Sequence, residues 1–316
     1  MAVGRRTLLA ALVASIISAF LWSTYYLFVL WVTPGTPPSA ILAYPFVVGG
    51  VAYAGWNAAT GHLRAFASLW ADPMAYGRVA LLFGMQVSVL AATYLTGPVD
   101  ASLLSLIGDV VLTPIIVALL LASYRAHIAT PLFAVGLVVS LAGGTMAIVG
   151  GQSLASVAGW GWLCVPGVPI TVAAYFLLCA RANRTQPASA VVGQSMLAAG
   201  VVFLLTAPLF PGGWGGLGEV SPIPFVLLVL CGITSFFLAD VLYFRAIEQV
   251  GLAIPPMLMT GIPVFTLLLS AGVLGIALPL IGVLGIPVAV VGAVLALRGE
   301  SAVSDEAHTE QPRPVN

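Results

Sequence analysis

The sequence predicts an all-α integral membrane protein with ten transmembrane helices, arranged as two inverted five-helix repeats. Three observations predict this fold: an apolar composition, a one-sided distribution of arginine, and an internal repeat. Of the 316 residues, 61% are hydrophobic and only 6% are charged. Soluble domains carry about 25% charged residues. The composition therefore indicates a helical membrane protein that crosses the bilayer many times.

Ten apolar segments are each long enough to span a hydrocarbon core about 30 Å thick, at about 1.5 Å of helix per residue. The first segment follows Arg5 and Arg6 and resembles a signal peptide. Its apolar run is too long, however, and no small-residue cleavage site follows, so we interpret it as a spanning helix. The predicted segments are Leu8–Val32, Ser39–Ala59, Ala75–Thr96, Ala101–Ala122, Pro131–Gly150, Gly159–Ala180, Ala188–Leu209, Pro222–Phe244, Leu252–Leu274 and Leu278–Leu297.

The basic residues set the predicted orientation. All ten are arginines, and in this topology every one falls on the same side of the membrane. The positive-inside rule therefore predicts a multi-pass protein of the cytoplasmic membrane with both termini in the cytoplasm. The net charge is zero, so no polybasic surface indicates nucleic-acid binding. The arginines are Arg5, Arg6, Arg64, Arg78, Arg125, Arg181, Arg184, Arg245, Arg298 and Arg313.

The second half of the chain repeats the first at an offset of 149 residues, which matches Tyr26 with Tyr175 and Pro114 with Pro263. Five helices are an odd number, so the second repeat must be inverted in the membrane relative to the first. Inverted repeats are typical of secondary transporters, whose solute site lies between the repeats near the bilayer midplane.

The repeat divides the chain into two domains and a tail. Residues 1–150 form the first five-helix repeat, and residues 151–298 form the second, inverted one. Residues 299–316 are polar and contain proline, which predicts a disordered cytoplasmic tail. Two related halves can provide the two related conformations that alternating access requires.

Several stretches resemble one known family. They are LWST at 21–24, AAYFLLCAR at 173–181, YFRAIEQVGLA at 243–253, and the helix-closing stretches at 136–144 and 285–293. These are similar to the EamA-type transporters of the drug/metabolite transporter superfamily. The resemblance implies ten helices in two inverted repeats, with helices 1, 3, 4, 6, 8 and 9 around a central cavity. The chain departs from the family pattern because it lacks the glutamates often found after helices 4 and 9.

The segment Ala101–Ala122 carries an acid, Asp109, near its middle. Ser105, Asp109 and Thr113 follow at helical spacing and share one face, and Pro114 frees a backbone carbonyl beside them. An ionised acid at the bilayer centre costs roughly 2.5–3.5 kcal/mol on insertion scales, and such acids are functional by default. We hypothesise that Asp109 binds the solute or a coupling proton. The alternative is a buried acid that is hydrogen-bonded by the neighbouring hydroxyl groups.

A second set of candidates combines aromatic and polar groups. Trp22, Tyr25 and Tyr26 lie on the first helix, and Tyr175 is the repeat counterpart of Tyr26. Aromatic side chains with polar tips suit a site for an apolar or aromatic solute. Gln86 on the third helix is a weaker polar candidate. For all of them the alternative role is helix packing through aromatic contacts and interhelical hydrogen bonds.

Gate and hinge residues are also predicted. Asp240 lies about one turn inside the cytoplasmic end of the eighth helix. One interpretation is that it forms a gate with Arg245 or Glu248. The other interpretation, which the sequence favours, is a shallow hydrated acid at the interface. Pro114 and Pro263 are predicted as paired hinges, with kinks that do not move as the alternative.

The sequence does not support an enzyme. No predicted membrane helix contains histidine, and the chain has no HExxH, GxSxG or Walker A motif. We predict no catalytic residues, metal site or cofactor. The predicted function is secondary-active export of a small organic metabolite, an amino acid or similar solute, by alternating access. The alternatives are a lipophilic-cation drug exporter and a non-transporting membrane scaffold or sensory subunit. The expected partners are the solute, the lipid bilayer and a coupling proton.

Overall fold

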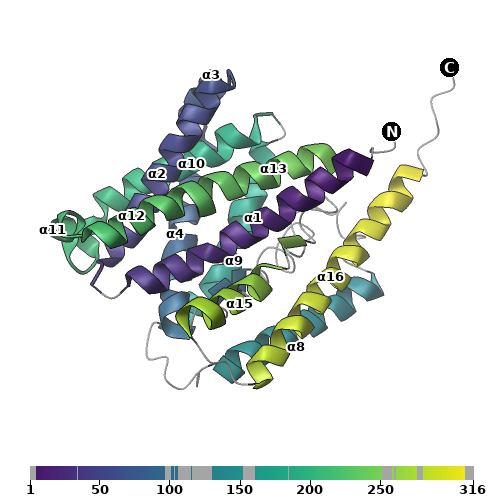
Figure 1. The fold of residues 1–316 in the computed structure, drawn as a ribbon. Helices are drawn as coiled ribbons and strands as arrows, with labels where there is room; N and C mark the ends of the chain where they lie inside the picture. The colour runs from purple at the N-terminus through teal and green to yellow at the C-terminus, as the bar shows by residue number, and fades with distance from the viewer. Residues whose placement is uncertain are drawn as a thin grey trace, which may run out of the picture.

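The structure is a computed structural model, and it describes residues 5–33, 35–96, 101–102, 104–105, 115, 130–151, 161–183, 185–250, 258–259, 261–275 and 280–309. All regular secondary structure within these ranges is helical (Figure 1). Each predicted transmembrane segment overlaps a described helix, except for Ala101–Ala122, most of which lies outside the described residues. The all-helical prediction is thus confirmed for the described part of the chain.

The described part of the chain consists largely of α-helices. They are α1 (Arg5–Val32), α2 (Pro38–Ala59), α3 (Leu63–Ser68), α4 (Pro73–Thr96), α8 (Pro131–Gly151), α9 (Gly161–Ala182), α10 (Ala188–Leu205), α11 (Gly213–Gly218), α12 (Pro222–Cys231), α13 (Ala239–Val250), α15 (Ile262–Leu274) and α16 (Leu280–Thr309). Short 3₁₀ turns cover Leu69–Ala71 and Ala207–Leu209. A π-helical stretch, Gly232–Leu238, joins α12 to α13.

Five of the described stretches are long and apolar enough to cross a membrane. They are Thr7–Val32, Pro38–Ala59, Pro73–Leu95, Ala188–Leu205 and Pro222–Ile247. Four shorter apolar stretches lie in the remaining large helices: Pro131–Met146, Gly167–Cys179, Ile262–Val273 and Leu280–Ala296. Length and composition therefore indicate a chain that crosses a membrane several times.

Prolines mark the starts of several helices. Pro38, Pro73, Pro131 and Pro222 are the first residues of α2, α4, α8 and α12. The first turn of a helix leaves its N–H groups unpaired, so proline loses no hydrogen bond there, and its fixed φ angle suits the helix. These prolines explain why the predicted starts of these helices fall within two residues of the observed ones.

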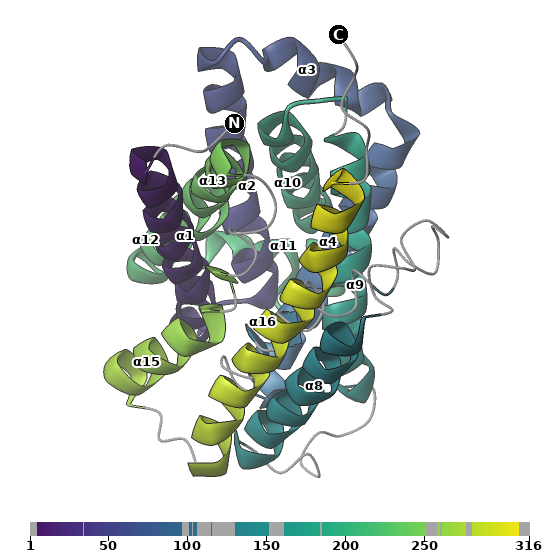
Figure 2. The same ribbon diagram turned by 90° about the vertical axis from the view of Figure 1, so that its right-hand side faces the viewer.

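The large helices pack in pairs. α2 packs against α10, α4 against α9, α1 against α13, and α8 against α16. The first three pairs form one bundle, whose buried core draws on α1, α2, α4, α9, α10 and α12. α8 and α16 lie side by side in both views, and α15 packs against α16 (Figures 1 and 2).

Small residues bring α8 and α16 into backbone contact. A Cβ atom added to Gly136 would lie 2.7 Å from the carbonyl oxygen of Gly292, and one added to Gly292 would lie 2.7 Å from that of Gly136. Both distances are too short for a real Cβ, so only glycine fits at either position. Close backbone approach through small residues is a common basis of helix association in membranes.

The last helix is longer than predicted. α16 runs to Thr309, well beyond Leu297, where the last transmembrane segment was expected to end. Residues 299–309 therefore continue the helix inside the segment that the sequence predicts to be a disordered tail. They include Glu300, Ser301, Asp305 and Glu306, a polar composition that suits a helix leaving the apolar region.

Candidate functional site

Buried polar side chains form a layer between α1, α2, α4, α9 and α13. Asp240 at the start of α13 is only 8% exposed, and its Oδ1 accepts a hydrogen bond from Trp22 Nε1 on α1 (2.8 Å). Ser18 Oγ donates to the neighbouring carbonyl of Ala239 (2.7 Å). The sequence favoured a shallow hydrated acid at this position. The structure instead buries Asp240, because α1 packs along α13 and covers it.

Tyr53 on α2 adds a hydroxyl group to this layer. Its side chain is fully buried, with the hydroxyl close enough to the Asp240 carboxyl group to interact with it. By hydrogen-bond geometry, however, this hydroxyl has no partner among the described residues. Its ring packs edge-on against Phe237, with 5.1 Å between the ring centroids. The sequence analysis did not identify Tyr53, whose position in a long apolar helix gives no signal of its role.

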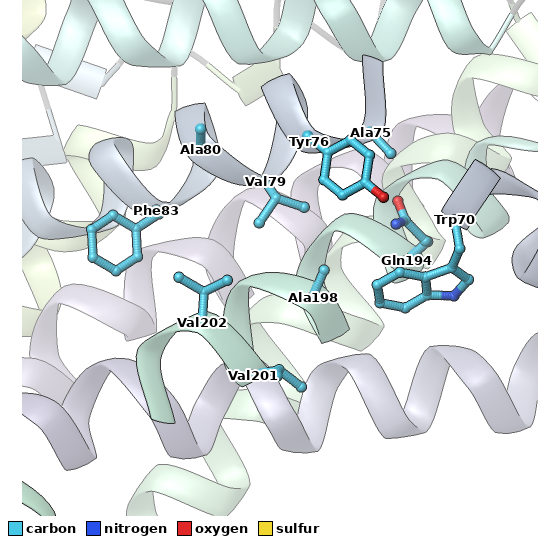
Figure 3. A pocket seen from close by; sticks show the side chains of 10 residues that line it. All are labelled: Trp70, Ala75, Tyr76, Val79, Ala80, Phe83, Gln194, Ala198, Val201 and Val202. Carbon is cyan, nitrogen blue, oxygen red and sulfur yellow. The ribbon is translucent and has the colours of Figure 1, made fainter. Parts of the chain in front are cut away.

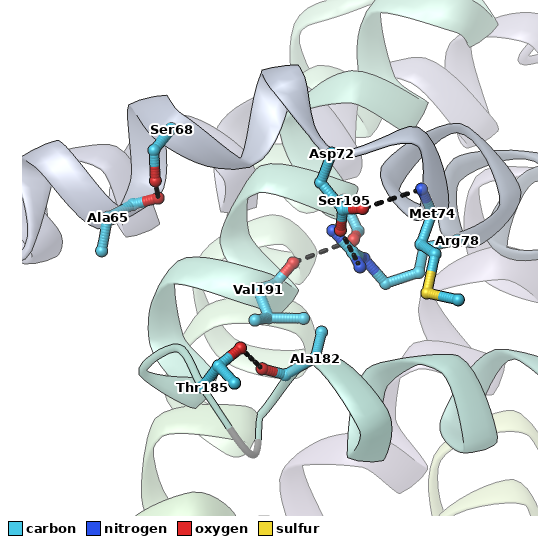
Figure 4. A network of polar contacts seen from close by, with 9 residues as sticks. All are labelled: Ala65, Ser68, Asp72, Met74, Arg78, Ala182, Thr185, Val191 and Ser195. Carbon is cyan, nitrogen blue, oxygen red and sulfur yellow. Dashed lines mark hydrogen bonds and ion pairs between the residues drawn. The ribbon is translucent and has the colours of Figure 1, made fainter.

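Arg78 is the most unusual residue of the layer. Its side chain is 0% exposed, and Nη1 donates to Asp72 Oδ2 (3.0 Å), as Figure 4 shows. The other oxygen of Asp72 accepts the backbone N–H of Met74 (2.9 Å), so Asp72 is fixed at the start of α4. The remaining nitrogens, Nε and Nη2, have no hydrogen-bond partner among the described residues. A buried cation with unpaired donors costs free energy, which makes this position a candidate site.

The spacing of buried residues explains the orientation of Arg78. Arg78, Leu82, Gln86, Val89 and Thr93 are all at most 4% exposed and follow at intervals of three or four, so they form one face of α4. Gln86 on this face accepts a hydrogen bond from Tyr25 on α1, and α4 as a whole packs mainly against α9. The sequence analysis placed Arg78 at the cytoplasmic end of its helix and did not assign it to a face. Its helical spacing from Leu82 and Gln86 would have placed it on the buried face.

Two residues of α9 connect the charged groups. Tyr175 is 5% exposed and Cys179 is 2% exposed. Both side chains lie within electrostatic range of Asp240 and of Arg78. Within the described part of the chain, however, the carboxyl group of Asp240 forms no ion pair. The structure thus brings the predicted residues Trp22, Tyr175 and Asp240 together with residues that the sequence analysis missed.

A second hydrogen-bonded network continues along α1. Tyr25 donates to Gln86 Oε1 (2.9 Å), and Tyr26 donates to Ser105 Oγ (3.0 Å). Ser105 in turn donates to the carbonyl of Ala101 (3.1 Å). These predicted residues therefore contact one another at the α1 side of the core. Three further predicted site residues, Asp109, Thr113 and Pro114, lie outside the described residues.

The remaining predicted gate and hinge residues lie elsewhere. Arg245 is exposed, and its guanidinium group lies 4.8 Å from the ring centroid of Trp56, so it does not pair with Asp240 in this structure. Pro263 was expected in the middle of a continuous helix. It is instead the second residue of α15, which begins at Ile262, so it occupies a first turn where it breaks no helical hydrogen bond.

Two cavities lie near this layer. The larger, about 470 Å³, runs between α4 and α10 and is lined mainly by apolar side chains such as Val79, Phe83 and Val202 (Figure 3). Gln194 also lines it, and its Oε1 has no partner among the described residues. The smaller cavity, about 200 Å³, lies between α2, the start of α10 and α13. Tyr53 lines it, so this cavity reaches the edge of the polar layer.

Comparison with known proteins finds one similar family and a similar solved structure. Residues 159–298 match the EamA-like transporter family. A solved chain described as "Crystal structure of protein" has a similar fold, with a TM-score of 0.67 and 22% identity over 90% of this chain and 96% of that chain. The comparison with curated proteins gave no match. The match covers the second predicted repeat and supports the predicted resemblance to EamA-type transporters of the drug/metabolite transporter superfamily.

Proposed function

We propose that the protein is a secondary-active carrier that moves a small organic solute by alternating access between two inverted five-helix halves. The observation that carries this proposal is the pairing of helices. An offset of 149 residues along the sequence matches α1 with α9, α2 with α10, α4 with α12–α13, and α8 with α16. Under this exchange the α1–α13 pair becomes the α9–α4 pair, while the α2–α10 and α8–α16 pairs become themselves. The described packing is therefore unchanged when the halves are exchanged.

This exchange supports a mechanism with two related conformations. If each half can adopt the packing that the other shows, the α1–α13 and α4–α9 contacts can open and close in turn. The buried polar layer lies on these helices. A solute bound there would face one side of the membrane in each conformation.

The chemistry of the layer supports a substrate class. Aromatic rings with polar tips, a buried acid and a buried arginine suit a small polar solute with an apolar part, so we propose export of an amino acid or similar metabolite. Asp109 stays a predicted solute or proton site. A lipophilic cation is the second candidate, because Asp240 provides a buried carboxyl group beside aromatic rings.

Counterflow tests the proposal directly. Purified protein is reconstituted into liposomes loaded with unlabelled solute, and the uptake of labelled solute is followed without any ion gradient. Amino acids, organic acids and lipophilic cations are tested in turn, with protein-free liposomes as the control. A carrier gives transient, saturable accumulation of one class. A scaffold or sensory subunit gives none for any class, and that result would refute the carrier.

A further inference from the structure

We infer that the larger cavity, between α4 and α10, is a binding site for an uncharged aromatic molecule that carries one hydrogen-bond donor, with Gln194 as the acceptor. None of the residues that line this cavity belongs to the buried polar layer. The inference is therefore independent of the proposed carrier function and goes beyond it. It rests on the volume of the cavity, the uncharged aromatic lining, and the unpaired side-chain oxygen of Gln194.

The walls of the cavity are single faces of two neighbouring helices. Tyr76, Val79 and Phe83 follow at intervals of three and four on α4, so they share one face. Gln194 and Ala198 are four residues apart on α10 and share a face in the same way. The two helices pack against each other. The space between these faces, about 470 Å³, falls within the range of about 300–1,000 Å³ that is usual for small-molecule sites.

The lining of the cavity determines which ligands fit. All ten lining residues are uncharged, and Trp70, Tyr76 and Phe83 provide three aromatic rings. A charged ligand would lose its hydration here without gaining an opposite charge from the lining. Aromatic rings attract one another in edge-to-face and offset-stacked arrangements. The lining therefore favours an uncharged aromatic molecule.

The cavity connects the outer surface of the helix bundle with a buried amide group. Trp70 is 43% exposed and Tyr76 is 69% exposed, whereas Gln194 is 1% exposed. Figure 3 shows these three side chains at the same end of the cavity. Both α4 and α10 contain stretches long and apolar enough to cross a membrane, so the outer surface of this helix pair faces the bilayer. An aromatic molecule dissolved in the bilayer can enter from that side.

Two buried glutamines show why Gln194 is a candidate acceptor. Gln86 is 4% exposed, and its Oε1 accepts a hydrogen bond from Tyr25 (2.9 Å). The Oε1 of Gln194 has no partner among the described residues. A buried acceptor has lost its hydrogen bonds to water, and an N–H or O–H group of a ligand would replace them. Rotation about the terminal torsion of glutamine is broad, so the unpaired oxygen can turn toward a donor in the cavity.

Two pairs of matched probes test the assignment on the full-length protein in lipid nanodiscs. Indole carries one N–H donor and 1-methylindole lacks it, while 2-naphthol carries one O–H donor and 2-methoxynaphthalene lacks it. Equilibrium dialysis measures the binding of each probe, and protein-free nanodiscs give the background from partition into lipid. The wild type is compared with Gln194→Met, which keeps the length of the side chain and removes the acceptor. Gln249→Met is the matched control, because Gln249 is exposed on α13 and lines neither cavity.

The expected result is a preference for donors that depends on Gln194. The wild type binds indole and 2-naphthol saturably, and about tenfold more tightly than their methylated partners. Gln194→Met binds the two members of each pair equally, with the affinity for the methylated probes unchanged within about threefold. Gln249→Met behaves as the wild type. Without any probe, Gln194→Met unfolds at the wild-type temperature or above it, because it replaces an unpaired buried group with an apolar one.

Other results would overturn the inference. It fails if the wild type binds neither indole nor 2-naphthol above the lipid background, or binds both members of each pair equally. It also fails if Gln194→Met keeps the preference for donors, or weakens all four probes alike. A clearly lowered unfolding temperature of Gln194→Met without probe would show that the amide is already paired inside the protein. Counterflow tests the carrier separately, since neither outcome there changes the binding expected at Gln194.

Discussion

The α8–α16 pair and the polar layer between α1, α4, α9 and α13 are held together in opposite ways. In the pair, glycine backbones touch, and the buried Ser140 on α8 lies against Gly292 of α16. In the layer, the helices contact one another through hydrogen-bonded side chains such as Trp22 and Asp240, and several polar atoms have no described partner. The pair has one close-packed arrangement. The layer leaves buried polar atoms without a described partner, and this difference is the reason for proposing the layer as the binding site.

A side chain in the close-packed pair gives the largest expected effect. A Cβ atom on Gly143 would lie 2.7 Å from the carbonyl oxygen of Gly285 and would clash with the backbone nitrogen of Ala289. We expect Gly143→Leu to destabilise the protein by about 3 kcal/mol or more. Thermal unfolding and folded yield in detergent measure this. Gly55→Ala is the control, because nothing lies within 4 Å of its added Cβ. Equal behaviour of the two variants would contradict the close packing.

Removal of the buried charge in the layer should act in the opposite direction. Arg78→Met deletes a guanidinium group that is 0% exposed and has two unpaired nitrogens. Its ion-pair partner Asp72 is 33% exposed and can be solvated once Arg78 is replaced, so we expect the loss of the buried guanidinium group to be neutral or stabilising. We expect a raised unfolding temperature together with lost transport. Arg64→Met on exposed α3 should change stability by less than about 0.5 kcal/mol. A large loss of stability in Arg78→Met would show that Arg78 serves the fold.

The hydrogen bond between α1 and α13 should have an intermediate effect. Trp22→Phe removes the Nε1 donor to Asp240 and keeps an aromatic ring beside Tyr243. We expect a loss of about 1–2 kcal/mol. A double-mutant cycle with Asp240→Asn measures the coupling between the two side chains, which should exceed about 0.5 kcal/mol. Strictly additive effects would mean that the 2.8 Å contact contributes nothing.

The smallest effect distinguishes two tyrosines. The hydroxyl of Tyr25 donates to Gln86, whereas the hydroxyl of Tyr53 makes no hydrogen bond to any described residue. Tyr25→Phe should therefore cost about 1 kcal/mol of stability in the solute-free protein, and Tyr53→Phe should be close to neutral. Unfolding measurements without solute compare the two variants side by side. A larger loss for Tyr53→Phe would show that its hydroxyl is already paired.

Most of the helical architecture was predictable because it depends on local signals. Apolar runs long enough to cross a membrane, with prolines such as Pro38 and Pro222 at their starts, gave the helices and many of their bounds. The start predicted at Leu252 lies outside the described residues, and only Pro263 can be compared with the structure. The described helix begins at Ile262, one residue before Pro263, so this proline opens the helix and does not interrupt it.

The site was less predictable because it depends on contacts between distant segments. Trp22 and Asp240 are 218 residues apart in sequence, and nothing local indicates that α1 covers α13. The sequence analysis therefore favoured a hydrated Asp240. Arg78 was missed because the sequence analysis used it only to assign the orientation of the chain in the membrane. Its position on the buried face of α4 was not considered. Asp109 lies outside the described residues and stays a prediction.

The native thiol of Cys179 provides the most direct test of alternating access, because it lies in the polar layer and is 2% exposed. Cys164 and Cys231 are replaced by alanine, and a membrane-impermeant thiol reagent is applied to right-side-out and to inside-out vesicles. The carrier predicts that Cys179 reacts from both sides, and that bound solute slows the reaction from each. Reaction from one side only, or from neither, would contradict a site that opens alternately to the two sides of the membrane.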